Sequence, residues 1–225
     1  MDQDPVAEAR YVPALRFHWL TRFYDRVLRL TLPEERLKGL LVEQANPGEG
    51  HQVLDLGCGT ATLTVMLKKA VPEATVVGLD GDPVVIRLAR EKIARSGVSV
   101  EVYEGMAFSP PFEAASFDRV VSSLMFHHLS ATQKELTLRS ILKLLKPGGE
   151  LHILDWGQAQ NFAMRVAFLV VQLLDGFDTT RDNVRGALVL MMQDAGFVDV
   201  EETRRSMSIV GTLSLYRARR PDVGV

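Results

Sequence analysis

The sequence predicts one α/β domain with a mostly parallel sheet of seven strands, helices on both faces and an antiparallel strand at its C-terminal end. Short β-rich runs alternate regularly with helical patterns, which is typical of parallel sheets with helical crossovers. The length of 225 residues, with 47% apolar and 24% charged residues, fits a single domain with a sizeable core. A turn bearing two glycines follows the first strand, where such sheets bind ligands.

The first elements are separated by clear start and stop signals. We expect strands at 52–56 and 74–80, the glycine turn at 57–60, and helices at 61–71 and 84–97. Pro72 ends the first of these helices because proline lacks the amide hydrogen that a helix interior needs. Asp82 is suited to cap the second helix, with Pro83 at its first position and Gly97 at its end.

The later elements continue the alternation. We expect strands at 99–105, 117–123 and 150–157, helices at 134–146 and 184–197, and two closing strands at 197–205 and 207–219. The run 147–149 (PGG) stops the helix before it. The closing strands have almost no linker, so they should pair antiparallel. We expect residues 1–45 to form an N-terminal helical lid and residues 158–190 a cap inserted after the fifth strand.

The overall charge and the cysteine count narrow the function classes. A formal net charge of −2 and a pI near 6.2 argue against a broad phosphate-binding surface, so we expect no nucleic acid partner. One cysteine, Cys58, excludes an internal disulfide and a metal site built from several cysteines. Nothing at the N-terminus reads as a signal peptide, which predicts a cytoplasmic location. The apolar run 162–174 falls short of the ~20 residues of a membrane span. It could be a core helix, a lid, a membrane-surface helix or a homodimer face.

The glycine turn and the acid after it predict a nucleoside cofactor. Glycines at 57 and 59 let the backbone bend sharply and approach a ligand. Asp80 ends the second strand, where a carboxylate can accept hydrogen bonds from both ribose hydroxyls. A dinucleotide fingerprint would need a third glycine at 62, which is Thr62. Asp55 would repel a pyrophosphate but could stabilise a cationic ligand, directly or by fixing the loop.

Five ordered motifs carry a resemblance to a known family. They are VLDLGCGT (53–60), VVGLDGDP (76–83), EGMAFSPPFEAASFDRVVSSLMFHHL (104–129), LLKPGGELHILDW (144–156) and DAGFVDVE (194–201). The chain resembles class I S-adenosylmethionine-dependent methyltransferases from about residue 20 onward, and within them the small-molecule enzymes near the quinone-biosynthesis C-methyltransferases and phospholipid N-methyltransferases. The resemblance implies a Rossmann-like three-layer sandwich, S-adenosylmethionine as cofactor and a small, hydrophobic or amphipathic acceptor. It implies these cofactor-binding residues: Tyr24, Asp55, Gly57, Cys58, Gly59, Thr60, Asp80, Gly81, Met106, Ala107 and Ser122.

The sequence departs from the family pattern at two positions. The glycine loop of the family usually ends Gly-Thr-Gly, but Ala61 stands at its last position, which is tolerable if this residue has helical backbone angles. The adenine loop usually carries an acid where this chain has Met106, which accepts hydrogen bonds poorly but could pack on the ring. These departures give some weight to an alternative, a non-catalytic cofactor-binding regulator or partner subunit.

The tetrapeptide 109–112 (SPPF) is similar to the motif with which amino-methyltransferases hold a base or a glutamine amide. In those enzymes the motif follows the fourth strand, where a flipped base can reach the sulfonium. Here SPPF precedes the strand 117–123, and the residues after that strand are 122–125 (SSLM). We therefore expect SPPF to be a structural loop.

Several side chains are candidates for chemistry near the acceptor. His127 and His128 could supply a general base, although a hydrogen-bonded core histidine beside one that packs on the next helix is the alternative. Tyr24 could close over the cofactor, or it could pack the N-terminal helix against the core. Asp155 could orient a polar acceptor or be a solvated loop residue. Cys58 should make backbone contacts only, because no paired base is apparent.

Overall fold

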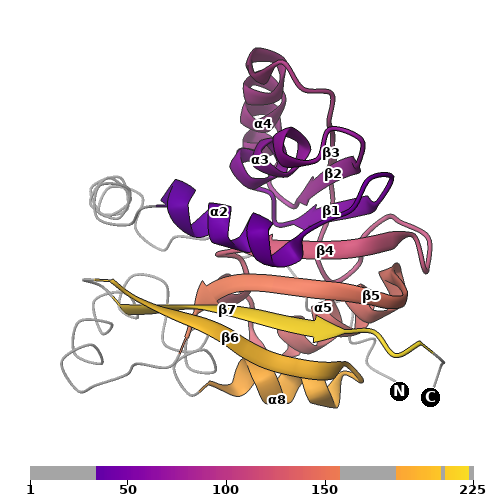
Figure 1. Cartoon of the computed structure of the whole chain (residues 1–225), viewed down its shortest axis with the longest axis vertical. Coiled ribbons are helices and arrows are strands. Elements are labelled where there is room, and N and C mark those ends of the chain that lie inside the picture. The colour runs from indigo at the N-terminus through magenta and orange to yellow at the C-terminus, as the bar shows by residue number, and fades with distance from the viewer. Residues whose placement is uncertain (1–33, 158–185, 209–210, 223–225) are drawn as a thin grey trace, which may run out of the picture.

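The computed structural model describes residues 34–157, 186–208 and 211–222 and has seven strands in one sheet (Figure 1). The strands are β1 (Gln52–Leu56), β2 (Thr75–Asp80), β3 (Glu101–Glu104), β4 (Phe117–Ser123), β5 (Leu145–Trp156), β6 (Val198–Ser208) and β7 (Gly211–Arg219). The helices are α2 (Glu34–Ala45), α3 (Thr62–Ala70), α4 (Pro83–Ser96), α5 (Ala131–Leu144), α8 (Ala187–Asp194) and the short 3-10 turn η1 (Phe126–His128). The predicted Rossmann-like α/β class is confirmed.

The strand order determines where a ligand can bind. The order is β3-β2-β1-β4-β5-β7-β6, and β7 alone runs antiparallel to its neighbours β5 and β6. The chain goes from β1 outward to β3 and then returns to the other side of β1 with β4. Ligands in open α/β sheets bind beyond the carboxyl ends of the strands at such a reversal. The expected site therefore lies between the loops that follow β1 and β4.

Helices cover both faces of the sheet (Figure 1). Along β1 the side chains alternate in direction, as they do in any strand. Val53 packs with Leu41 of α2 on one face, while Leu54 packs with Leu138 of α5 on the other. α3 and α4 lie on the same side as α2 and share their own apolar cluster, and α8 lies beside α5. Each fully buried leucine of this kind stabilises the fold by about 2 kcal/mol.

The capping signals of α4 and α5 account for where these helices begin. Asp82 accepts a hydrogen bond from the Val84 amide at 2.8 Å, and Gly97 adopts the left-handed conformation (φ +73°) after the last turn, as predicted. For α5 the predicted start at 134 was three residues late, because Ser130 and Gln133 form a reciprocal capping box.

The end of α5 also differs from the prediction. The helix stops at Leu144, and β5 already begins at Leu145, so the run 145–149 that was expected to finish the helix and turn is the start of the strand. Gly148 has φ +72°, which allows the bend inside this segment. A register shift in the pairing of β4 with β5 absorbs the extra residues.

Some predictions lie outside the described residues. They include Tyr24, the lid except for α2, and the cap except for the residues from 186 onward, which lead into α8. The apolar run 162–174 lies outside as well, so its alternatives stay predictions. Within the described ranges, no helix has both the length and the apolar character that crossing a bilayer requires.

Candidate functional site

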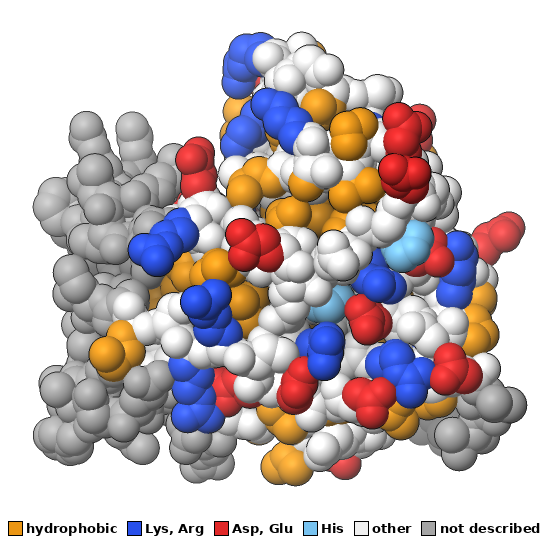
Figure 2. Space-filling view, viewed as in Figure 1, with side chains coloured by type: hydrophobic (Ala, Val, Ile, Leu, Met, Phe, Trp, Pro, Cys, Tyr) orange, Lys and Arg blue, Asp and Glu red, His pale blue; other side chains and the backbone are white. Residues whose placement is uncertain are grey.

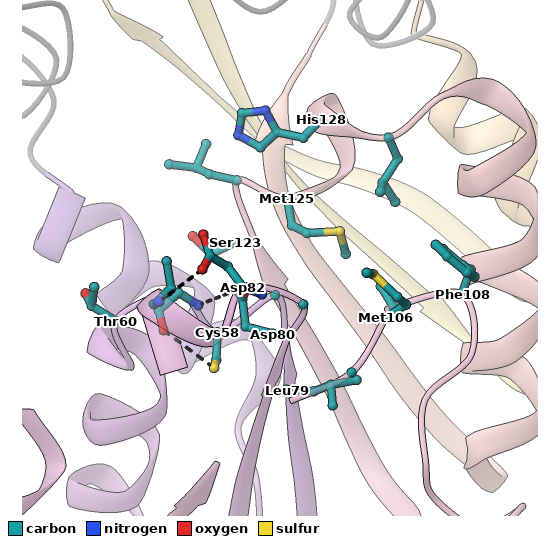
Figure 3. A pocket seen from close by; sticks show the side chains of 18 of the residues that line it. Cys58, Thr60, Leu79, Asp80, Asp82, Met106, Phe108, Ser123, Met125 and His128 are labelled. Carbon is teal, nitrogen blue, oxygen red and sulfur yellow. Dashed lines mark hydrogen bonds between the residues drawn. The ribbon is translucent and has the colours of Figure 1, made fainter. Parts of the chain in front are cut away.

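A cavity of about 450 Å³ lies at the carboxyl ends of β1, β2 and β4 (Figure 3). This volume is in the range of small-molecule sites, about 300–1,000 Å³. The cavity is lined by α2, the glycine turn, the loop after β2 with the first turn of α4, the loop after β3, and the segment from Ser123 to the first turn of α5. The lining residues are Glu34, Lys38, Gly57, Cys58, Gly59, Thr60, Leu79, Asp80, Gly81, Asp82, Val85, Gly105, Met106, Ala107, Phe108, Ser123, Leu124, Met125, His128, Leu129 and Gln133.

The glycine turn is tied to β2 and packed against the loop after β4. The amides of Gly57 and Cys58 both donate to the Leu79 carbonyl, at 2.8 and 3.0 Å. Gly57 has φ +73°, and a Cβ at this position would lie 2.4 Å from Met125 Cγ. Only glycine satisfies both conditions. The turn therefore brings the cofactor side of the cavity into direct contact with the loop after β4.

Asp80 organises the cofactor side through its carboxylate. One oxygen accepts from the Gly59 amide at 2.9 Å and the other from the Asp82 amide at 3.0 Å. A carboxylate has about four lone-pair sites, so each oxygen can accept one more hydrogen bond. Asp80 faces the cavity, and its position suits the two hydroxyls of a ribose.

Asp55 and Ser122 do not line the cavity, although both were predicted to bind the cofactor. Asp55 is 1% exposed and accepts from the Thr64 hydroxyl at 2.6 Å. Burial raises the pKa of Asp55 to about 6, and the hydrogen bond from Thr64 only partly opposes this effect. Ser122 donates its hydroxyl to the Leu56 carbonyl at 2.8 Å. Both side chains thus fix the strands and α3 behind the glycine turn, and Asp55 acts through the loop.

Cys58, Thr60, Gly81, Met106 and Ala107, which the resemblance implies as cofactor-binding residues, line the cavity. A Cβ at Gly81 would lie 3.0 Å from Met106 Sδ, so the thioether occupies the space that a side chain at 81 would need. Burial raises the pKa of the Cys58 thiol, and the charges of Asp55 and Asp80 raise it further. The thiol is therefore held in its protonated, unreactive form.

Ala61 does not have the helical backbone angles on which its replacement of glycine depended. Its φ of 62° and ψ of 29° lie in the left-handed region, just before α3. A non-glycine residue in this conformation carries about 1–2 kcal/mol of strain. The methyl group is fully buried in the cluster between α3 and α4, which offsets part of this cost.

The other end of the cavity is mostly apolar and carries one histidine. Leu124, Met125 and Leu129 follow β4 and line this end together with His128 and Gln133. Figure 3 shows Met125 and Met106 extending into the same space, with His128 on the side of Met125 away from Met106. The tetrapeptide SPPF is a loop before β4, where Ser109 donates its amide to the Met106 carbonyl at 3.0 Å, so the interpretation of it as a structural loop fits.

Asp155 is fully buried, which corrects its interpretation as a solvated loop residue or a contact to the acceptor. Its carboxylate accepts from the amides of Phe126 at 2.8 Å and Trp156 at 2.7 Å. Burial alone would raise the pKa of Asp155, but the charge and hydrogen bond of His127 and the Trp156 amide lower it. The ionised carboxylate therefore binds the protonated Nδ1 of His127, 2.9 Å away.

The two histidines have different positions. His127 is buried beneath the cavity lining and held by Asp155, whereas His128 lines the cavity. Their ring centroids lie 3.9 Å apart. Burial and the neighbouring His127 charge lower the pKa of His128 to about 3, with Asp155 opposing them weakly. His128 is consequently neutral near pH 7 and can accept a hydrogen bond.

Two lining residues on α2, Glu34 and Lys38, were missed in the sequence. The signal available was their i, i+4 spacing with opposite charge, but that pattern is typical of any solvated helix surface. Leu79, near the end of β2, and Phe108, in the loop after β3, were missed as well, because an isolated apolar residue in the sequence is typical of the core.

Charges of both signs are interspersed on the face that Figure 2 shows. On β6 and β7, Arg217 pairs with Glu201 and Arg219 with Asp199, at 2.6 and 2.8 Å. Over the described residues of this face, no stripe of one sign stands out. A groove that follows a phosphate backbone would need such a stripe.

Comparisons with known proteins agree with this geometry. Residues 53–149 match a family model described as a methyltransferase domain. The chain is 27% identical to an uncharacterized methyltransferase of Synechocystis, covering 91% of this chain and 92% of that protein. It is 28% identical to a ubiquinone/menaquinone biosynthesis C-methyltransferase of Shewanella pealeana, covering 80% and 79%. Its fold is similar to that of the S-adenosylmethionine-dependent methyltransferase SibL in its apo form, with a TM-score of 0.69, 22% identity and coverage of 90% of this chain and 58% of that chain.

Proposed function

Because the chain is a class I S-adenosylmethionine-dependent methyltransferase, we propose that it methylates a small, hydrophobic or amphipathic acceptor. The observation that carries the proposal is the apolar wall of Leu124, Met125 and Leu129 beside the glycine turn. A nucleotide or a charged peptide would leave its polar groups unpaired against such a wall, at a cost of about 1–3 kcal/mol for each group. An aromatic ring or an alkyl chain would not.

The residues of the cavity suit the cofactor. S-adenosylmethionine, when bound, supplies an electrophilic methyl group on a sulfonium sulfur. Asp80 would hold the ribose hydroxyls, while Met106, Ala107 and Phe108 would pack against the purine. Gly57 and Gly59 leave the turn without side chains, so the ligand can approach the backbone closely. The buried charge of Asp55 lies behind this turn and favours a cationic ligand in front of it.

The enzyme's contribution to the reaction is mainly positioning. Methyl transfer needs the nucleophile about 3 Å from the methyl carbon and in line with the bond that breaks. His128 is neutral near pH 7 and lines the acceptor end, so it would accept a hydrogen bond from a hydroxyl or an amine of the acceptor. His127, fixed by Asp155, supports the His128 ring from below.

The low pKa of His128 favours hydrogen bonding to the acceptor over removal of a proton from it. A general base works best when its pKa lies near the operating pH, and a histidine with a pKa of about 3 is a weak proton acceptor. We therefore assign His128 the orientation of the acceptor rather than the removal of its proton. A phenol or hydroquinone fits this role, since it offers one hydroxyl and an otherwise apolar ring. Several relatives are named for ubiquinone and menaquinone biosynthesis, which supports the same acceptor class.

The first test is cofactor binding by titration calorimetry. The wild type should bind S-adenosylmethionine and S-adenosylhomocysteine, while NAD serves as the negative control. Asp80→Asn, which keeps the shape but removes the charge, should weaken both ligands by about 100-fold, because it loses charge-assisted hydrogen bonds. A wild type that binds neither ligand would refute the proposal.

The second test is methyl transfer to a panel of acceptors. We expect labelled methyl to appear on hydroquinones or phenols with short apolar tails, and not on RNA, DNA or a peptide mixture. His128→Asn keeps a hydrogen-bonding group, and His128→Ala removes it. We expect Ala to lower kcat/KM by about 10-fold, as the loss of one hydrogen bond predicts, with the Asn variant closer to the wild type. Methylation confined to nucleic acid or protein would contradict the proposed acceptor class.

We also infer a cytoplasmic place of action. The inference is supported by the single cysteine, which fits a reducing compartment. Fractionation of cells that express a tagged full chain tests it. Recovery in an extracytoplasmic fraction would overturn the assignment, and recovery with membranes would instead favour peripheral contact through 162–174.

A further inference from the structure

Lys38 is a buried cation in the wall of the cofactor cavity. It lies in the second turn of α2, its side chain is only 11% exposed, and it lines the cavity beside the glycine turn. Its ammonium donates to Glu34 Oε1 at 2.6 Å. Removing an ammonium from water is costly unless it is paired, so the fold keeps this charge in place through Glu34. A charge retained in this way at a cavity wall can contact a ligand.

The position of Lys38 relative to the rest of the cavity indicates which part of a ligand it would meet. Its positive charge acts on both Asp55 and Cys58, whose pKa values it lowers slightly against the stronger effect of burial. Lys38 therefore lies near the start of the glycine turn. The purine side, by contrast, is formed by Met106 and Phe108 from the loop after β3. Asp80, bonded to the Gly59 amide, lies between these two ends.

The chemistry of the cofactor's two ends fits this arrangement. Beyond the ribose, S-adenosylmethionine ends in an amino acid with an α-carboxylate. A lysine ammonium has three N–H donors, and among the described residues one of them is used, by Glu34. A lysine near a sulfonium would be repulsive unless anions lie close to it. Glu34 is one such anion, and the ligand's own carboxylate would be a second.

We propose that Lys38 binds the α-carboxylate of the cofactor's methionine part and that Glu34 is the positioning residue that holds the Lys38 ammonium at the cavity wall. This inference rests on the proposed function, because it assumes the same cofactor in the same cavity. It assigns to α2 the recognition of the amino-acid end, whereas the loops after β2 and β3 recognise the nucleoside end. The pair of the buried Lys38 and the partly exposed Glu34 is then part of the binding site.

Two ligands that differ only at the amino-acid end make the test selective. S-adenosylhomocysteine carries the α-carboxylate, and 5′-methylthioadenosine has the same nucleoside and a sulfur but no amino acid. Titration calorimetry on the full chain should show that Lys38→Gln weakens S-adenosylhomocysteine by about 10- to 100-fold, the loss expected for a charge-assisted hydrogen bond. Its affinity for 5′-methylthioadenosine should stay within about 2-fold.

Three further variants distinguish binding from a structural role. Lys38→Arg keeps the charge and should retain most of the affinity for S-adenosylhomocysteine. Glu34→Gln should cause a smaller, still ligand-selective loss, because the ammonium is less well fixed. Lys69→Gln is the matched control, since Lys69 is an exposed lysine in the last turn of α3 and should change neither ligand. The thermal midpoint of each variant without ligand shows whether α2 still packs.

Each outcome decides the inference. Equal weakening of both ligands by Lys38→Gln would mean that α2 only supports the cavity, and the inference falls. Unchanged binding of S-adenosylhomocysteine in Lys38→Gln would overturn it as well. Failure of the wild type to bind either ligand would remove the proposed function together with this inference. Selective loss of S-adenosylhomocysteine affinity, with the Arg variant close to wild type, supports it.

Discussion

Two buried carboxylates, Asp55 and Asp155, lie behind opposite ends of the cavity, and their pKa values are shifted in opposite directions. Asp55, behind the glycine turn, accepts one hydroxyl hydrogen bond, and burial raises its pKa to about 6. Asp155, behind the histidines, accepts from two backbone amides and from His127, and these interactions lower its pKa despite complete burial. Burial alone therefore does not determine the state of a carboxylate. The number and charge of the donors around it do.

The largest expected effect concerns Asp155. Asp155→Asn keeps the shape but removes the charge that pairs with His127, and an amide cannot accept all three hydrogen bonds. Because breaking one partner of a buried ion pair costs about 3–5 kcal/mol, we expect the free energy of unfolding to fall by about 4 kcal/mol at pH 7.5. Urea denaturation followed by circular dichroism measures it.

Asp55→Asn is the matched control for this change. Its ionised form is disfavoured by the fold, so the neutral amide should cost less than 1 kcal/mol or stabilise the protein. Equal losses of unfolding free energy in Asp155→Asn and Asp55→Asn would contradict the difference in charge state between the two carboxylates.

The pH dependence of stability should differ in the same way. The folded state raises the pKa of Asp55 from 3.8 to about 6, so the folded protein binds a proton that the unfolded chain releases between these values. Stability from this group is therefore greatest below pH 4 and falls as pH rises to 6, by about 3 kcal/mol for two pKa units. The difference between wild type and Asp55→Asn, measured by urea denaturation from pH 3.5 to 7.5, isolates this effect. A pH-independent difference would contradict it.

Asp155 should show the opposite sign. Its folded pKa lies below the ordinary 3.8, so its contribution is fully present above pH 4 and is lost only as pH falls further. The gap in stability between wild type and Asp155→Asn should hence narrow as pH falls from 4.5 to 3, where the wild-type carboxylate begins to take up a proton. A gap that widens over this acidic range would show that Asp155 is not ionised in the way its contacts indicate.

A smaller effect is expected where the two ends touch. Gly57→Ala forces a Cβ to within 2.4 Å of Met125 Cγ and places alanine at φ +73°. Overpacking and backbone strain together should cost about 2–3 kcal/mol. In the double variant with Met125→Ala the contact with Cγ is removed, while the 2.8 Å overlap with the Cβ of residue 125 and the backbone strain remain, so the double-mutant cycle should give a coupling energy of about 1 kcal/mol. A coupling energy near zero would show that the glycine turn and the loop after β4 do not pack against each other at this contact.

The smallest expected effect is at Ala61. Ala61→Gly relieves left-handed strain but deletes a fully buried methyl group, so the two contributions nearly cancel and stability should change by less than about 0.5 kcal/mol. Ala89→Gly makes the same chemical change at an equally buried position inside α4, where it should cost about 2 kcal/mol. The difference measures the strain at Ala61, and equal losses would mean that none is present.

The sequence predicted the cofactor end better than the acceptor end, and the reason is the range of the contacts. Asp80 and the glycine turn follow from residues within one strand-turn-helix unit, so a short motif is enough to place them. The pairing of His127 with Asp155 spans 28 residues and depends on η1 folding over the end of β5. No local pattern distinguishes that arrangement from an exposed acid at a strand end, so the interpretation of Asp155 as solvated was wrong.

Other differences have equally specific causes. Asp82 and Gly97 mark α4 correctly because capping is a local interaction. The sequence pattern predicted a helix from Ala61 onward, but the turn before α3 places Ala61 in the left-handed region, and the helix begins at Thr62. Lys38 could not be predicted as a cavity residue, because the order of strands and helices does not show which face of α2 meets the cavity. Side-chain burial at an interface between distant elements is information that a single sequence does not contain.

The strand order has a consequence for the synthesis of the protein. Among the described strands, β7 comes last along the chain, yet it fills the place between β5 and β6 and is the one strand that pairs with β6. Until β7 has been synthesised, one edge of β5 has no strand partner, and β6 lacks the strand that joins it to the sheet. Unpaired edges are templates for association with other chains. A ribosome that stalls before residue 211 would therefore release a chain with two open edges, and quality control should detect this fragment far more readily than the finished protein.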